Sequence, residues 1–218
     1  MRMVFAASTA ALAFALSATT AMGSHFTGAY IGVDLGYGWG DANSQNFGAI
    51  GGPLTSTQAD AELDGFVGGG HIGHAWSIAP NWILGVEGGF RFNGLEGDDG
   101  GSSGDVNELS ANWDASLQAQ LGVLAGPNTM LYVTGGFAWL DADSNVTDPG
   151  EQETVSETFG GWTLGGGLAF GLGPNCSGRI QYRYTDYDEE VLTFPVNIYD
   201  MAVGPTTHEV TVGVSWHL

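Results

Sequence analysis

Large apolar residues alternate with small or polar ones along most of this chain, with the two-residue period of a β-strand. In residues 26–39, Ile31, Val33 and Leu35 occupy one face, and glycines together with Asp34 occupy the other. Seven further stretches repeat this pattern, at residues 65–78, 82–92, 113–123, 131–139, 162–170, 179–185 and 210–218. The alternation therefore predicts eight strands and an all-β fold.

Three Pro-Asn pairs punctuate the predicted strands at an even spacing. They are Pro80-Asn81, Pro127-Asn128 and Pro174-Asn175, each 47 residues after the previous one. Proline presets φ for a turn and asparagine tolerates the left-handed conformation, so each pair predicts a tight hairpin turn. The remaining connections are long, at residues 41–64, 93–112, 141–160 and 186–207. Short and long connections in alternation predict strands that run up and down.

The two faces of each predicted strand differ in the size of their side chains. One face is large and apolar, whereas the other is rich in glycine and polar residues and could not form the core of a soluble protein. Apolar-out, polar-in strands of about ten residues are typical of membrane barrels. We therefore predict an eight-stranded antiparallel transmembrane up-and-down β-barrel. A secreted β-sandwich or lipocalin-like barrel is the alternative.

The N-terminus has the features of an export signal. Arg2 precedes an apolar run at residues 3–16, and Ala21-Met22-Gly23 offers small residues where signal peptidase reads. We predict a cleaved signal peptide at residues 1–23 and a single barrel domain at residues 24–218, with a membrane anchor as the alternative for the first segment. Because Cys176 is the only cysteine, the chain cannot form an internal disulfide.

The charge is strongly negative. The chain has four arginines, no lysine and 24 carboxylates, so loss of Arg2 would leave a net charge of −21. A nucleic-acid-binding protein needs the opposite sign, and we exclude that class.

With these stretches placed, the chain resembles a known family. Residues 30–39, 68–73, 82–87, 131–136, 161–163, 182–186 and 210–214 carry the resemblance. They are similar to the small outer-membrane barrels of alphaproteobacteria that are called outer-membrane immunogenic or porin-family proteins, within the OmpA-type class. The resemblance implies a place in the outer membrane of a Gram-negative bacterium, contact with its lipids and lipopolysaccharide, insertion by the barrel-assembly machinery, and a monomer.

The chain departs from this family in two places. Basic residues are usual on the inner face of the fourth and eighth strands, where this chain has Gln118, Gln120, Thr211 and His217. The usual C-terminal aromatic residue, which the assembly machinery reads, is replaced by Leu218.

All three arginines of the predicted barrel fall on the inward face. Counting along the strands places Arg91 beside Asp114 and Arg183 opposite Glu209, with Glu209 at the upper edge. Buried ions in a narrow barrel must be paired, so we predict a polar network in the lumen. Its members are Asp34, Glu87, Arg91, Asp114, Gln118, Gln120, Arg179, Arg183 and Glu209. Such a plug suits a structural or surface-interaction protein, and a narrow passive pore for ions or small solutes is the alternative.

The other carboxylates crowd the long connections, which leaves two interpretations open. They are solvated loops, or they bind Ca²⁺ weakly in a surface adhesin. Asp141, Asp143 and Asn145 have calcium-loop spacing, but Val146 and Gln152 replace the glycine and bidentate glutamate of such a loop. We therefore predict no resident cofactor.

The histidines do not predict catalysis. His25, His71, His74, His208 and His217 are scattered, and the strand positions suggest no serine and carboxylate at the height of any of them. We predict that the protein is not an enzyme.

Overall fold

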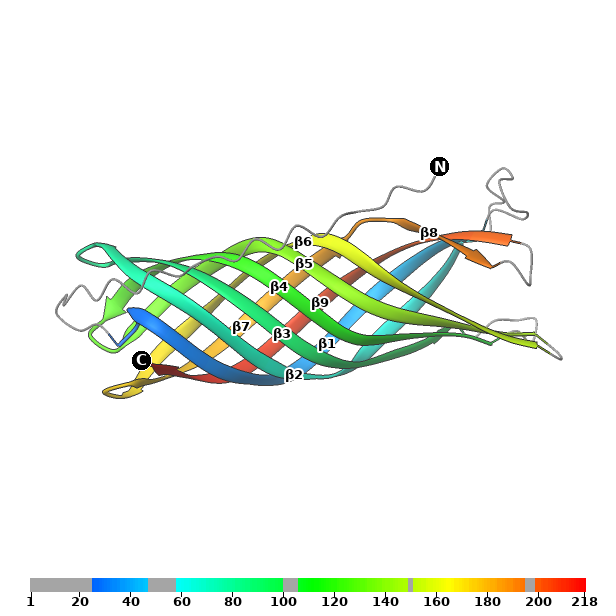
Figure 1. Cartoon of the computed structure of the whole chain (residues 1–218). Helices are drawn as coiled ribbons and strands as arrows, with labels where there is room; N and C mark the ends of the chain where they lie inside the picture. Colours follow the sequence, from blue (N-terminus) through cyan, green and yellow to red (C-terminus); the bar gives the residue numbers. More distant parts are fainter. Residues whose placement is uncertain (1–24, 47–57, 100–105, 149–150, 195–198) are drawn as a thin grey trace.

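The computed structural model of the chain describes residues 25–46, 58–99, 106–148, 151–194 and 199–218. The predicted signal peptide and its cleavage point lie outside these residues. Within them the chain forms antiparallel strands that wrap around one axis (Figure 1). Their bounds are β1 (Gly28–Asn46), β2 (Gln58–Ala79), β3 (Trp82–Asp99), β4 (Val106–Gly126), β5 (Thr129–Asp148), β6 (Glu151–Gly173), β7 (Cys176–Tyr187), β8 (Glu190–Phe194) and β9 (Tyr199–His217).

Eight of these strands close the barrel. β1 to β7 pair in sequence order, β9 follows β7, and β9 pairs with β1 to complete the wall. The short β8 pairs only with the start of β9 and lies at the end of the barrel away from the C-terminus (Figure 1). The predicted fold class and strand number are confirmed.

The three Pro-Asn pairs form the turns between β2 and β3, β4 and β5, and β6 and β7, as predicted. Each turn is also tied to the next hairpin, because its asparagine carbonyl accepts a backbone hydrogen bond from the following pair of strands. The amides of Leu124, Gly171 and His217 donate to the carbonyls of Asn81, Asn128 and Asn175 at 2.8, 2.9 and 2.9 Å. Each Pro-Asn turn is therefore linked to a strand end that lies next to it on the same rim. We call this end of the barrel the turn side and the opposite end the loop side.

At the loop side the strands continue into the stretches predicted as long connections. β1 continues to Asn46 and pairs with β2 from Gln58 onward, and β5 and β6 pair from Asp148 and Glu151 inward. The paired hairpins thus extend past the strand ends that the sequence predicted. Backbone pairing needs no lipid, so a strand can continue into water once its neighbour is in register.

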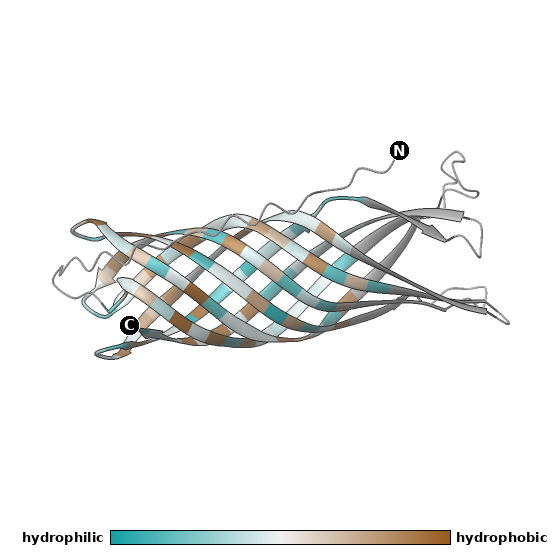
Figure 2. Ribbon diagram, in the orientation of Figure 1, coloured by the Kyte–Doolittle hydropathy of each residue, from teal (hydrophilic) through white to brown (hydrophobic). Residues whose placement is uncertain are grey.

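The outer and inner faces of the strands follow the predicted alternation. Large apolar side chains such as Leu35 and Phe92 are exposed on the outside, while the intervening residues are buried in the lumen. Figure 2 shows the resulting alternation of colour along the coloured parts of the strands. In the described residues no helix is long and apolar enough to cross a membrane.

Glycines on the inner face make room for long side chains from neighbouring strands. A Cβ at Gly32 would overlap the ring of His71, and a Cβ at Gly213 would overlap Asp34 Oδ1. Gly69, Gly73 and Gly167 give the same clearance to Arg91, Tyr30 and Tyr132. The small residues of the inner face are therefore the spaces into which the polar side chains fold.

Candidate functional site

The lumen contains two clusters of buried charge. The turn-side cluster consists of Tyr30, Asp34, His71, Glu87, Arg179 and Ser215, and the loop-side cluster consists of Arg91, Asn93, Asp114, Arg183 and Glu209. The turn-side cluster comes from five neighbouring strands, β7, β9, β1, β2 and β3, whereas the loop-side cluster joins β3 and β4 to β7 and β9 across the lumen.

The turn-side cluster is organised by Arg179. Its Nε donates to Asp34 Oδ1 at 2.9 Å and its Nη2 donates to Asp34 Oδ2 at 2.6 Å, a two-point ion pair. Its Nη1 donates to Glu87 Oε2 at 2.6 Å. The hydroxyl of Tyr30 donates to the same Glu87 oxygen at 2.9 Å. One guanidinium thus joins carboxylates from β1 and β3 across the lumen.

The strand register explains how Arg179 reaches Asp34. Gly213 of β9 pairs with Asp34 of β1 on one side and with Arg179 of β7 on the other. Because Gly213 has no side chain, the arginine can extend across β9 to the aspartate. The charge pair therefore depends on a glycine between its two members.

The loop-side cluster is organised by Arg183 and Glu209. Arg183 donates from Nε and Nη2 to the two oxygens of Glu209 at 3.1 and 2.8 Å, and from Nη2 to Asp114 Oδ2 at 2.9 Å. Arg91 Nη1 donates to Glu209 Oε2 at 2.5 Å. Arg183 is only 2% exposed and Asp114 only 1%, so these charges are compensated by one another rather than by water.

The predicted registers are correct, but the ion pairs also join residues that are not partners in the strand ladders. Arg91 pairs with Asp114 and Arg183 with Glu209 in the strand ladders. The ion pair of Arg91 nevertheless goes to Glu209, and that of Asp114 goes to Arg183. Glu209 also lies deep in the lumen instead of at its upper edge, because β9 begins ten residues earlier, at Tyr199.

The two glutamines of the predicted network also point inward. Gln118 and Gln120 are buried on β4, and Gln118 Nε2 donates to Ser116 Oγ at 3.3 Å. The structure thus places all nine predicted network residues in the lumen, seven of them within the two ionic clusters.

Apolar side chains close both ends of the lumen, which the sequence analysis missed. At the turn side Phe26, Tyr30, Ala75, Ile83, Met130, Tyr132 and Ala169 pack together, with Leu124 against them. Towards the loop side Leu63, Val67, Leu95, Leu140, Phe159 and Tyr187 are buried. A bulky apolar residue at an inward position near a strand end, such as Ile83 or Met130, could have indicated these apolar layers from the sequence.

A small cavity lies where the turn-side apolar layer meets the turn-side cluster. Its volume is about 30 Å³, and Tyr30, Glu87, Gln120, Arg179 and Ser215 are among its lining residues. A space of this size can hold water. The cavity offers no room for a larger solute.

His71 corrects the expectation that no histidine meets both a serine and a carboxylate. Its Nδ1 lies 2.7 Å from Asp34 Oδ2, and its Nε2 lies 2.8 Å from Ser215 Oγ. Gly32 of β1 pairs with His71 on one side and with Ser215 on the other, so barrel closure brings them to one level. Strand positions alone do not reveal this contact, because His71 and Ser215 are 144 positions apart in the chain.

The order of hydrogen bonds matches a hydrolytic triad, but its surroundings do not match hydrolytic chemistry. A triad needs room for a substrate carbonyl at the serine and donors for the oxyanion. Ser215 is buried beside the water-sized cavity, and both oxygens of Asp34 already accept hydrogen bonds from Arg179. The serine and histidine thus extend the ionic cluster.

This interpretation predicts that Ser215 is unreactive. Folded protein treated with a fluorophosphonate probe should keep its unmodified intact mass, because the probe cannot enter the lumen. Labelling that disappears in Ser215→Ala would contradict the assignment.

The weak calcium candidates lie on strand β5 rather than in a loop. Asp141 and Asp143 both accept from Asn112 Nδ2, at 3.4 and 2.8 Å, while the side chain of Asn145 is outside the described residues. Across the described part of the chain, no group of three or more histidine, cysteine or acidic side chains could hold a metal ion. Weak calcium binding by the loops stays an alternative, and the absence of a resident cofactor stays a prediction.

A closed barrel with an apolar outer wall and paired charges in its lumen is a transmembrane β-barrel of the outer-membrane class. A family model described as outer membrane protein beta-barrel domain matches residues 8–217. The chain belongs to this family, and its place is the outer membrane of a Gram-negative bacterium.

Named relatives agree with this assignment. The 31 kDa outer-membrane immunogenic protein of Brucella melitensis is 31% identical over 196 residues, which cover 82% of each chain. The 25 kDa outer-membrane immunogenic protein of Brucella canis is 31% identical over 201 residues, covering 88% of this chain and 78% of that one. The outer membrane protein OprG from Pseudomonas aeruginosa shares the fold, with a TM-score of 0.56 at 13% identity over 88% of this chain and 97% of that one.

Proposed function

We propose that this protein is a closed, non-catalytic barrel that displays its acidic loop-side hairpins on the cell surface. The observation that carries the proposal is the double closure of the lumen, by ionic clusters in the middle and apolar side chains towards both ends. In this class of barrel the short turns face the periplasm and the longer connections face outward.

A conducting pore is disfavoured by the cost of opening the lumen. Each of the three arginines is bound to at least one buried carboxylate, and Arg179 and Arg183 each bind two. Separating one partner from a buried pair costs about 3–5 kcal/mol, and a water-filled path would have to separate several. The plug is therefore the resting and the stable state of the lumen.

The charge distribution supports a surface-interaction role. Asp34, Glu87, Asp114 and Glu209 lie in the lumen, and the other 20 carboxylates fall at residues 41–64, 96–108, 141–157 and 186–200. These stretches fall within the four predicted long connections, and they contain no lysine or arginine. Such a surface attracts cationic partners and repels nucleic acid and lipopolysaccharide phosphates unless divalent cations intervene. We expect a monomer that is inserted by the barrel-assembly machinery.

Conductance in a planar bilayer tests the closed lumen. Purified refolded protein should give no steady single-channel steps, while a general porin reconstituted in the same way gives them and establishes sensitivity. Reproducible steps from the wild-type barrel would favour the narrow pore and reject the plug.

A further inference from the structure

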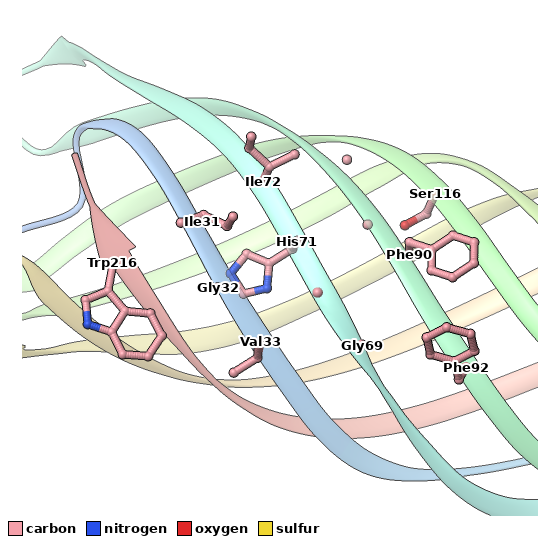
Figure 3. A pocket seen from close by; sticks show the side chains of 13 residues that line it. Ile31, Gly32, Val33, Gly69, His71, Ile72, Phe90, Phe92, Ser116 and Trp216 are labelled. Carbon is pink, nitrogen blue, oxygen red and sulfur yellow. The ribbon is translucent and has the colours of Figure 1, made fainter.

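The lipid-facing wall of the barrel is hollowed by an open groove across β1, β2 and β3. The groove has a volume of about 840 Å³, and its outward-pointing side chains are almost entirely apolar. They include Ile31, Val33, Ile72, Phe90, Phe92 and Trp216 (Figure 3). The volume falls within the range of roughly 300–1,000 Å³ that is common for ligand sites.

Two outward-facing glycines form the floor of this groove. Gly70 on β2 pairs with Val33 and Phe90, and Gly88 on β3 pairs with Ile72 and Leu117. Each of these glycines lies between large apolar side chains on the two neighbouring strands and has no side chain of its own. The depth of the groove therefore comes from these two missing side chains.

The fold does not require glycine at either position. A Cβ at Gly70 would meet only the Gly32 carbonyl oxygen at 3.4 Å, and a Cβ at Gly88 would meet only the Ser116 carbonyl oxygen at 3.9 Å. In the described residues only Gly28 has a positive φ, so backbone conformation does not demand them either. A glycine lowers the stability of a strand. On the inner face this loss is offset, because each glycine makes room for a buried side chain from a neighbouring strand. Gly70 and Gly88 have no such role, and what they leave open is the groove.

The groove lies in the apolar band of the barrel wall. In Figure 3, Trp216 lies at one end, close to the end of β9, and Phe90 and Phe92 lie at the other. In a membrane this band faces the acyl chains of the bilayer. An occupant in this band has no water to contact and must be apolar and elongated.

We propose that the groove is a binding site for one acyl chain of an outer-membrane phospholipid, seated between the ridge of Ile31 and Val33 and that of Phe90 and Phe92. The proposal depends on the membrane location and is independent of whether the lumen conducts.

A second copy of the barrel fits this surface less well. The common two-fold interface brings the same patch of both copies together, so groove would face groove and the void would be doubled. An acyl chain fills the depression with methylene groups and leaves the flanking side chains in contact with the bilayer.

Photocrosslinking tests the site directly. The barrel is reconstituted in vesicles of phosphatidylethanolamine that contain a small fraction of the same lipid with a diazirine in mid-chain. After illumination, the crosslinked peptides are mapped by mass spectrometry. We expect crosslinks concentrated on residues 31–33, 70–72 and 88–92, above the level found elsewhere on the apolar belt.

A pair of variants separates binding from general lipid contact. Gly70→Leu with Gly88→Leu fills the floor and should reduce groove crosslinks to the belt level. The matched control is Gly135→Leu on β5, another outward glycine whose Cβ has free space, its nearest neighbours lying at 3.8 Å. It should leave the groove crosslinks unchanged.

Several outcomes would overturn the proposal. They are an even distribution of crosslinks around the wild-type belt, groove crosslinks that survive the double variant, and crosslinks between two protein copies at residues 31–33 and 88–92. The wild-type map decides the matter even if the double variant fails to insert.

Discussion

Arg183→Met is expected to lower the free energy of unfolding by about 3–5 kcal/mol, the typical cost of removing one partner from a buried ion pair. Arg183 is the described ion-pair partner of Asp114 and one of two for Glu209. Methionine has a similar volume, so the packing changes little while the carboxylate of Asp114 remains buried without its cation. Guanidinium unfolding of the refolded barrel in lipid vesicles, followed by circular dichroism and by heat-modifiable gel mobility, measures the change.

A second substitution separates charge from packing in this test. Arg183→Met combined with Asp114→Asn removes the stranded charge, while Glu209 keeps Arg91. Most of the lost stability should return, since a buried pair replaced by neutral groups is often nearly neutral in energy. A double variant as unstable as Arg183→Met alone would mean that the loss comes from packing.

Gly213→Ala is expected to destabilise the barrel by about 3 kcal/mol or more, although it adds a single methyl group. The new Cβ would overlap Asp34 Oδ1 and lie 2.8 Å from the Val33 carbonyl oxygen. Asp34 would have to leave the two-point pair with Arg179 and the hydrogen bond with His71. The same unfolding experiment reports the effect, and a near-wild-type midpoint would show that the aspartate can move freely.

Gly70→Ala is the matched comparison for this change. It also places a methyl group on a strand glycine, but on the outer face, where the nearest atom is 3.4 Å away. Its stability should equal that of the wild type or exceed it by up to about 1 kcal/mol, because alanine loses less backbone entropy than glycine. The contrast would show that the inner glycines are needed for clearance and not for flexibility.

The fold was predictable because few physical rules determine it. Alternation along the strands assigned Ile31 to lipid and Asp34 to the lumen, and the Pro-Asn turns then determined the strand number and the registers. The ladder partners Arg91–Asp114 and Arg183–Glu209 followed by counting. Each of these inferences uses only the two-residue period of a strand.

The arrangement inside the lumen was less predictable, because long side chains extend along the lumen and contact residues other than their partners in the strand ladder. Glu209 bonds with both Arg91 and Arg183, and Arg179 crosses Gly213 to Asp34, which no count along a strand reveals. His71 and Ser215 meet only through the closure of the barrel between β1 and β9. The apolar layers at Phe26 and Phe159 were hidden for a similar reason, since their burial depends on the curvature of the whole wall.

The pairing of β1 with β9, which closes the barrel, has a consequence for the order of assembly. Asp34 comes from the first strand, whereas its partner Arg179 comes from β7, 145 residues later. Arg91 and Glu209 are 118 residues apart. Neither cluster can be complete before β9 pairs with β1. In a partly assembled barrel, the charged side chains therefore stay hydrated and the wall stays open between these two strands. The ion pairs thus form only when the barrel closes, and they stabilise the closed barrel over partly assembled forms.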